Sequence, residues 1–569
     1  MRRVTRRHLA ALAGLGASSS VLSAPGAPSF AHGVASGDPL ADRVVLWSRV
    51  SGYSAPVAVT VTVARDASLR DVVRRYETTT DASRDYTVKI DAIGLEPGQR
   101  YYYGFATADA RSATGRTKTL SIDDAPTVKL AVVSCANYPA GFFNVYRTIG
   151  NDNSLDAIVH LGDYLYEYPA DGYASSRAAQ FGRLSAPLQE VVALADYRQR
   201  HAQYKRDPDL QYAHAQLPFI AIWDDHEITN DAWTDGAQNH QPAEGDYGAR
   251  RRAAIQVYRE WMPIRDDGPA YRRFDFGKTA TLAMLETRLA ARSEPLSYSV
   301  DLDPLRRVVQ TASGPRELPS LVDPASNTRI DDPARIESLL AAGQAGVDYQ
   351  YEPDIDRFLA TTLADPQREL VGAEQMAWLD GICTESPAGH WLVLGNQTLM
   401  SAVQSPNMMR SLSATERNRI PGFLQPLLPL TRYSIPMNLD AWDGYPADRE
   451  RVFDRLANRS NNIVLAGDTH NAWAGPLKDR RGTQIAYEVA TPSVSSPGIE
   501  TTLALPAARL QTLFAAANPH LDYIGFGYRG YVELTLTPAT TTATYYSVSG
   551  TDERRFSLAQ QHRIRLPKR

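Results

Sequence analysis

The sequence predicts an α/β protein in which an all-β module precedes a larger, layered α/β domain. With 569 residues the chain is too long for a single hydrophobic core. Residues 29–122 are dominated by β-branched runs, and from residue 127 onward apolar runs alternate with helical stretches. The net charge of −4 at pH 7 and the even spread of Arg along the chain argue against a nucleic-acid-binding patch.

The first 28 residues have the layout of a twin-arginine signal peptide. Arg6 and Arg7 precede an apolar run, Leu9 to about Val21, that is too short to anchor a protein permanently in a membrane. No later apolar run reaches the length of about 18 residues that a bilayer requires, so we expect no transmembrane segment in the mature protein. The sequence therefore predicts export through the twin-arginine translocation machinery to the periplasm or the extracellular space.

Residues 29–122 are expected to form a β-sandwich of the fibronectin type. The β-branched runs at 44–50 and 57–63 are typical of strands. A leucine, a Pro-Gly turn and three tyrosines within 95–103 resemble the last strands of such sandwiches. This module contains no cluster of acids or histidines, so we expect it to have a structural rather than a catalytic role.

The larger domain is assigned to residues 127–550, after a linker at 123–126, and residues 551–569 are expected to be a C-terminal tail. Helices are expected over three stretches: 194–204, 249–261 and 375–381. Two long polar stretches, about 291–370 and 402–445, are rich in Pro, Ser and Arg. They are interpreted as insertions that shape a substrate cleft.

The most informative stretch is residues 155–167 (LDAIVHLGDYLYE), which reads as a buried strand followed by polar residues. Gly162 allows a sharp turn, and Asp163 and Tyr166 then follow the carboxyl end of the strand, where ligands bind in open α/β sheets. A carboxylate there can bridge two cations, and a phenolate can bind the more acidic one. The plain alternative is a Gly-Asp turn after a core strand.

Five strand-like runs in this domain end in such polar residues: 130–135, 155–167, 219–231, 390–397 and 462–471. If these strands are parallel neighbours, their tips converge on one edge of a sheet. The side chains presented there would be Cys135, Asp163, Tyr166, Asp224 or Asp225, His226, Asn230, Asp468 and His470.

These residues form a mixed set of oxygen, nitrogen and sulfur ligands. Carboxylate, phenolate and amide oxygens suit hard cations such as Fe(III), Mn(II), Mg(II) or Ca(II), while imidazole and thiolate suit iron or zinc. Two cations about 3.5–4 Å apart would clamp a phosphate, polarise it and make hydroxide from bound water. Phosphate esters need such help because their anionic oxygens repel a nucleophile.

Taken singly, each candidate also has a structural explanation. Cys135 could be a small buried hydrophobe, His470 a hydrogen-bonded histidine, and Asp225 a helix N-cap. Together these explanations would have to account for acids and histidines that gather at strand tips although the chain has only 11 histidines. The two cysteines, Cys135 and Cys383, leave open either one disulfide or two free thiols.

Several long motifs resemble the PhoD-type alkaline phosphatases of the metallophosphoesterase superfamily. They are residues 30–39 (FAHGVASGDP), 160–167 (HLGDYLYE), 207–210 (DPDL), 223–227 (WDDHE), 442–445 (WDGY) and 467–470 (GDTH). Together they extend over nearly the whole chain. The resemblance implies an N-terminal fibronectin-like β-sandwich followed by a four-layer α/β/β/α metallophosphoesterase sandwich.

The resemblance also implies an Fe(III) site like that of purple acid phosphatases, accompanied by Ca(II). The residues implied to bind iron are Cys135, Tyr166 and His470, and those implied to hold calcium are Asp225, Asp468 and Asn230. Asp163 would bridge the two ions, and Asp224 is the alternative to Asp225. His226 would lie beside the phosphate as a hydrogen-bond donor or a general acid, and Arg288 is a candidate phosphate contact.

The predicted function is that of an exported phosphoesterase acting on phosphate esters at alkaline pH, with metal-activated hydroxide attacking phosphorus in line. A phosphodiesterase, including a phospholipase D-like enzyme, would use the same site on a different ester. The alternative from another class is an exported, noncatalytic binding protein whose metal site is structural.

Overall fold

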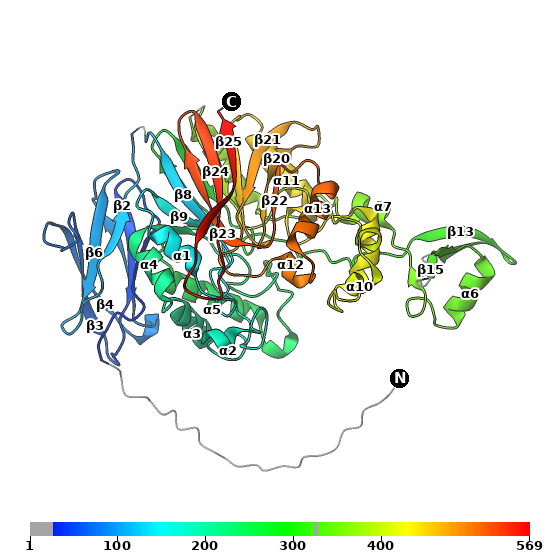
Figure 1. Cartoon of the computed structure of the whole chain (residues 1–569), viewed down its shortest axis with the longest axis horizontal. Coiled ribbons are helices and arrows are strands. Elements are labelled where there is room, and N and C mark those ends of the chain that lie inside the picture. Colours follow the sequence, from blue (N-terminus) through cyan, green and yellow to red (C-terminus); the bar gives the residue numbers. More distant parts are fainter. Residues whose placement is uncertain (1–26, 124, 324–327, 388, 569) are drawn as a thin grey trace, which may run out of the picture.

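The computed structural model describes residues 27–568 except 124, 324–327 and 388. All but the last two residues of the predicted signal peptide, 1–28, therefore lie outside the described residues. Two large β-sheets pack face to face, and helices cover their outer faces, which gives the predicted four-layer α/β/β/α sandwich (Figure 1). None of the helices in the described part of the chain combines the length and apolar character needed to cross a bilayer.

The first sheet has nine strands and contains both the first and the last strands of the described chain, which lie on opposite sides of it. Its order is β25 (Leu558–Pro567), β24 (Thr540–Val548), β23 (Arg529–Leu536), β8 (Val128–Val133), β9 (Ala157–His160), β10 (Phe219–Ala221), β1 (Val34–Gly37), β2 (Arg43–Arg49) and β5 (Thr87–Ile93). The neighbouring strands β8, β9 and β10 are parallel.

The second sheet has seven strands. Its order is β11 (Arg272–Phe276), β12 (Ala280–Met284), β18 (Trp391–Gly395), β19 (Asn462–Ala466), β21 (Gln484–Ala490), β20 (Ala472–Lys478) and β22 (Tyr523–Gly525). Between the sheets, Val132, Val159 and Ile220 of the first sheet belong to the same apolar core as Val393 and Leu465 of the second. Strands buried on both faces explain the continuous apolar runs in the sequence.

The helices cover the two outer faces. On the nine-stranded sheet lie α1 (Asn144–Gly150), α3 (Leu194–Tyr204), α4 (Pro208–Gln216) and α5 (Tyr247–Trp261), and on the seven-stranded sheet lie α8 (Gly372–Glu385) and α11 (Pro446–Leu456). The three helices expected from the sequence are confirmed as α3, α5 and α8, although α8 is longer at both ends than the stretch 375–381.

The N-terminal module is β-rich, as predicted. A four-stranded sheet, β4 (Val72–Thr80), β3 (Val57–Ala64), β6 (Arg100–Ala106) and β7 (Gly115–Lys118), packs on β1, β2 and β5 through an apolar core. Its second sheet is continuous with the larger α/β domain, because Gly37 at the end of β1 pairs in parallel with Phe219 of β10. A side chain at Gly37 would collide with the carbonyl oxygens of Phe219 and Pro263, so this junction requires glycine.

Two expectations about topology are corrected. The segment 551–569, expected to be a tail, contributes β25, which pairs antiparallel with β24 along its length. The segment was not recognised as a strand because it is polar and largely exposed: only Ile564 and Leu566 of β25 pack against the apolar core between the sheets. The five strands expected as neighbours are divided between two sheets, with β8, β9 and β10 in the first and β18 and β19 in the second.

The two insertions adopt different structures. Within 291–370, the strands β13 (Arg306–Thr311) to β17 (Gln350–Tyr351) and helix α6 (Pro333–Ala341) form a small lobe that projects at the right of Figure 1. The lobe has its own apolar core. By contrast, the insertion 402–445 folds into short helices that pack against α13 (Ala507–Ala517).

Asp207 provides a test of how the helical layer is held on the first sheet. Its carboxylate caps α4 by accepting hydrogen bonds from the backbone nitrogens of Asp209 (2.9 Å) and Leu210 (3.1 Å). It also pairs with Arg183 at 2.6 Å, and both side chains are buried. We expect Asp207→Ala to destabilise the protein by about 3–5 kcal/mol, because the Arg183 charge would be left buried without its carboxylate.

Asp246 offers the matched control, because it caps α5 in the same way but is largely exposed. Asp246→Ala should cost about 1 kcal/mol, the usual value for a lost cap. Denaturant midpoints of the two variants measure the difference. Similar losses for both would show that the ion pair contributes little beyond the cap.

Candidate metal centre

The predicted ligands lie in unusual backbone turns directly after buried strands. Cys135, Asp163, Asp468 and His470 have φ angles of 60°, 54°, 60° and 61°. Left-handed backbone is uncommon for residues other than glycine and costs on the order of 1–3 kcal/mol when it is strained. Such conformations gather at functional sites, so their recurrence here indicates that the turns are shaped to aim these side chains.

The first group of potential ligands contains the residues expected around iron. One ligand atom from each of Cys135, Asp163 and His470 lies within 4.8 Å of the others. The Tyr166 hydroxyl donates to Asp163 Oδ2 at 2.8 Å and lies 3.0 Å from Nε2 of His470. The structure thus brings together all four residues, which come from the tips of β8, β9 and β19.

A second group lies beside the first. Asp224, Asp225 and Asp468 place carboxylate oxygens within 4.8 Å of one another, and Asp163 forms a similar group with Asp225 and His226. Asp163 and Asp225 each belong to two of the groups, as expected of a carboxylate that bridges two cations. Asp224 and Asp225, between which the sequence did not decide, therefore both face the cluster.

Electrostatics make this cluster unfavourable without a cation. Burial, reinforced by neighbouring carboxylates, raises the pKa of Asp163 and Asp468 well above the ordinary value, and it raises the pKa of Asp224 to about 6. Three buried oxygens, Asp163 Oδ1, Asp224 Oδ2 and Asp225 Oδ1, have no hydrogen-bond partner among the described residues. Buried, unpaired carboxylate oxygens are costly, and metal ions are a usual way to satisfy them. The residues therefore fit a site for cations.

Of the candidate ligands with nitrogen and sulfur, Cys135 is buried and His470 is half-buried. Burial lowers the pKa of His470 to about 3, so its imidazole is neutral and free to bind a metal. Burial and the charge of Asp163 raise the pKa of the Cys135 thiol well above its usual value, which a cation would reverse. Cys135 and Cys383 are both free, which settles the alternative that the sequence left open.

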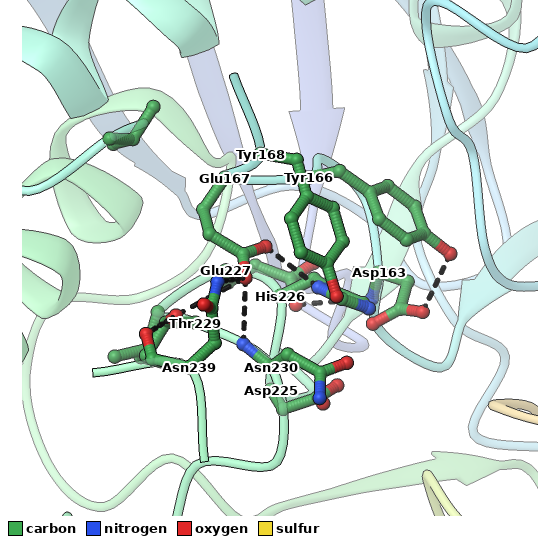
Figure 2. Close-up of polar contacts among 12 residues, drawn as sticks. Asp163, Tyr166, Glu167, Tyr168, Asp225, His226, Glu227, Thr229, Asn230 and Asn239 are labelled. Carbon is green, nitrogen blue, oxygen red and sulfur yellow. Dashed lines mark hydrogen bonds and ion pairs between the residues drawn. The ribbon is translucent and has the colours of Figure 1, made fainter. Parts of the chain in front are cut away.

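His226 is held in place by Glu167, a residue that sequence reasoning did not single out. Glu167 Oε2 lies 2.7 Å from Nδ1 of His226. The same carboxylate accepts hydrogen bonds from Thr229, from the backbone of Asn230 and from Asn239 (Figure 2). Burial opposes a charge on His226, but Asp225, Glu167 and Asp163 together raise its pKa well above the ordinary value, which favours the protonated ring.

Glu227 is a second buried acid with a positioning role. Its carboxylate accepts hydrogen bonds from the backbone nitrogens of Asp163 (3.1 Å) and Tyr164 (2.5 Å) after β9, and from that of Asp224 (2.8 Å) after β10. It therefore ties two ligand-bearing turns together. Burial raises its pKa to about 8. The only sequence signal for Glu167 and Glu227 was their place as the last residue of the motifs 160–167 (HLGDYLYE) and 223–227 (WDDHE).

Arg288, the candidate phosphate contact, is fully buried. It pairs with Asp224, and its other nitrogens lie 2.6 Å from Asp440, 3.6 Å from Asp225 and 3.7 Å from Asp468. Asp440 in turn holds Arg292 at 2.5 Å. The guanidinium therefore compensates the carboxylates from within the protein.

Asn230 lies at the margin of the cluster, beside Asp225 in Figure 2. Its side-chain nitrogen donates to Gln238 at 3.1 Å, so its amide oxygen is the atom it can offer to a cation. Together with His226, His470, Tyr168 and Tyr173 it lines a cavity that opens beside the metal ligands.

Comparisons with known proteins agree with this geometry. Residues 130–545 match the family model of the PhoD-like phosphatase, and residues 16–121 match that of the PhoD-like phosphatase N-terminal domain. Alkaline phosphatase D of Bacillus subtilis (strain 168) is 32% identical over 539 residues, which cover 91% of this chain and 77% of that protein. The solved structure described as "Structure of PhoD" superposes with a TM-score of 0.72 at 28% identity, covering 96% of this chain and 91% of that one. The chain therefore belongs to the PhoD-like phosphatases, which are phosphate-ester hydrolases.

Proposed function

We propose that this protein is an exported, metal-dependent phosphoesterase that hydrolyses phosphate monoesters and diesters at alkaline pH. The observation that carries the proposal is the buried cluster in which Asp163 is shared between two groups of ligand atoms. A pair of cations held this way matches the needs of phosphate-ester hydrolysis, where negative charge must be neutralised on both sides of phosphorus.

The resemblance to the PhoD-type phosphatases implies Fe(III) and Ca(II), and the donors on the two sides of the cluster are compatible with these ions. Thiol, phenol and imidazole from Cys135, Tyr166 and His470 favour Fe(III), with Asp163 as the bridge. Oxygen donors favour Ca(II), and the residues proposed to hold it are Asp225, Asp468 and Asn230, with Asp224 beside them. When bound, these ions would polarise the phosphate, neutralise its charge and lower the pKa of the attacking water.

The protein supplies the proton for the leaving group. The raised pKa of His226 favours its protonated form, and the ring lies within the same cluster as Asp163 and Asp225. As the bond between phosphorus and the leaving oxygen breaks, His226 would give its proton to that oxygen, so that a neutral alcohol leaves. Glu167 would act as a positioning residue, because its contact with Nδ1 fixes the ring and leaves Nε2 for the substrate.

Two rivals can be weighed. A noncatalytic binding protein with a structural metal site does not agree with membership of a phosphatase family. A phosphodiesterase, including a phospholipase D-like enzyme, uses the same ligands and differs only in the ester. Export by the twin-arginine route remains a proposal that rests on the Arg6-Arg7 pair and the apolar run behind it.

Turnover by the purified mature protein tests the central proposal. We expect hydrolysis of both 4-nitrophenyl phosphate and bis(4-nitrophenyl) phosphate at alkaline pH. Activity should be lost on treatment with a chelator and recovered with Fe(III) and Ca(II). A strong preference for the diester would favour the phosphodiesterase. Absence of turnover by protein shown to contain metal would contradict the proposal.

Cys135 can be tested through metal content. Cys135→Ser should lower bound iron several-fold, because a hydroxyl replaces the soft thiolate donor. Elemental analysis of the purified variant measures this directly. Cys383→Ser is the matched control, since Cys383 belongs to none of the candidate metal groups and should leave iron unchanged. Normal iron and full activity in Cys135→Ser would remove Cys135 from the ligand set.

Glu167 can be tested through the dependence on the leaving group. We expect Glu167→Gln to lower kcat about 10- to 100-fold for an alkyl phosphate, whose alcohol needs a proton to leave. The loss should be much smaller for 4-nitrophenyl phosphate, because nitrophenolate leaves without one. Glu190→Gln is the control, because Glu190 also contacts Asn239 but not His226. Equal losses with both substrates would indicate a merely structural role for Glu167.

A further inference from the structure

A cavity of about 410 Å³ opens directly beside the candidate metal centre. Its inner end is formed by Tyr168, Tyr173, His226, Asn230 and His470. Its volume is in the range of small-molecule sites, about 300–1,000 Å³. A group attached to a phosphate at the metal centre would therefore reach this cavity without crossing other structure.

The outer part of the cavity is apolar, and we call it the apolar groove. Its walls include Met408, Leu424, Leu427 and Met437 from the insertion 402–445, and Ile499 and Leu503 from the segment that leads to α13. No Asp, Glu, Lys or Arg is among the described residues that line the cavity.

This lining disfavours esters of the more polar alcohols. A sugar, a nucleoside or a second charged group would lose its hydrogen bonds to water on entering the groove, where the hydroxyls of Ser405, Thr431, Thr469 and Thr502 could replace only some of them. An alkyl chain gains from the same wall, because each buried methylene contributes about 0.8 kcal/mol. The two methionines adapt easily to the shape of a chain, because their side chains are unbranched and flexible.

The groove is also accessible from outside. Leu424, Leu427 and Met437 are only half-buried, although they belong to or flank the apolar cluster around α13. The neighbouring Phe423 is 72% exposed, so apolar surface continues along the insertion beyond Leu424. Side chains that served only to fill the interior would be covered more completely.

We propose that the apolar groove binds the alkyl chain of an amphiphilic phosphate ester whose phosphate lies at the metal centre. This inference rests on the proposed function and narrows it to a substrate class. The shared chemistry is an alkyl chain joined to phosphate through oxygen. Its source can be a soluble ester or a lipid in an aggregate, and the experiment below distinguishes the two.

The test is a series of 4-nitrophenyl n-alkyl phosphates with ethyl, butyl and octyl chains, assayed with the metal-loaded enzyme below the concentration at which they aggregate. The leaving group is constant, so the chain length reports on binding. We expect kcat/KM to rise by up to about fourfold per methylene, and at least tenfold from ethyl to octyl. A second series, ethyl and octyl phosphate followed by phosphate release, contains no aromatic group that could occupy the groove instead.

Variants locate the effect. Leu427→Gln and Met437→Gln place amides in the groove at half-buried positions and should reduce the preference for octyl over ethyl by about tenfold, with ethyl turnover unchanged. Leu513→Gln is the matched control: Leu513 is half-buried against the same apolar cluster but does not line the cavity.

The outcomes separate the two proposals. If ethyl esters are hydrolysed but chain length has no effect in either series, or if the groove variants affect ethyl and octyl esters equally, the groove proposal is wrong and the phosphoesterase remains. If metal-loaded enzyme hydrolyses none of the esters, the proposed function itself fails. If the preference for octyl esters increases further in mixed micelles, the groove proposal is supported and the natural substrate is a lipid. If the preference is seen only with monomeric esters, the proposal is supported and the natural substrate is a soluble ester.

Discussion

The carboxylates gathered where the two sheets meet are the constraint on which the rest of the structure depends. Asp163, Asp224 and Asp225 are buried and Asp468 is half-buried, and their carboxylates belong to overlapping groups of ligand atoms within 4.8 Å. Burying like charges is unfavourable. The protein compensates from within through Arg288, and it leaves several carboxylate oxygens without protein partners for a cation to satisfy. Three other acids fix the groups around this charge. Glu227 holds the turn at Asp163, Glu167 holds the ring of His226, and Asp440 holds the guanidinium of Arg288.

The parts of the site that could be predicted from the sequence are those that depend on residues close together in the chain. The strand tips could be predicted because an apolar run followed by acids and histidines is a local pattern, as at residues 155–167. The pairing of Arg288 with Asp224 and Asp440 could not, because these residues are 64 and 152 positions apart in sequence and leave no periodic signal. Glu167 was visible within its motif, but its role appears only when His226, from another strand tip, is beside it.

For the fold, too, local features could be predicted and long-range pairings could not. Helices such as α3 were predicted from local periodicity, and the layered class followed from alternating apolar runs and helices. The division of the ligand strands between two sheets was not predicted, because a strand buried on both faces does not specify its neighbour. The edge strand β25 was missed because it is largely exposed and rich in polar residues, and it therefore lacks the apolar run that marks a buried strand.

The order of the nine-stranded sheet has a consequence for how the protein is made. Strands β8, β9 and β10, which precede most of the candidate ligands, are flanked by β1 on one side and by β23 on the other. During synthesis the chain emerges from its N-terminus, so β8 lacks its outer neighbour until the last strands leave the ribosome. The candidate metal centre is thus among the last parts of the molecule to be enclosed, and a prematurely terminated chain would carry most of the candidate ligands but no closed sheet to hold them.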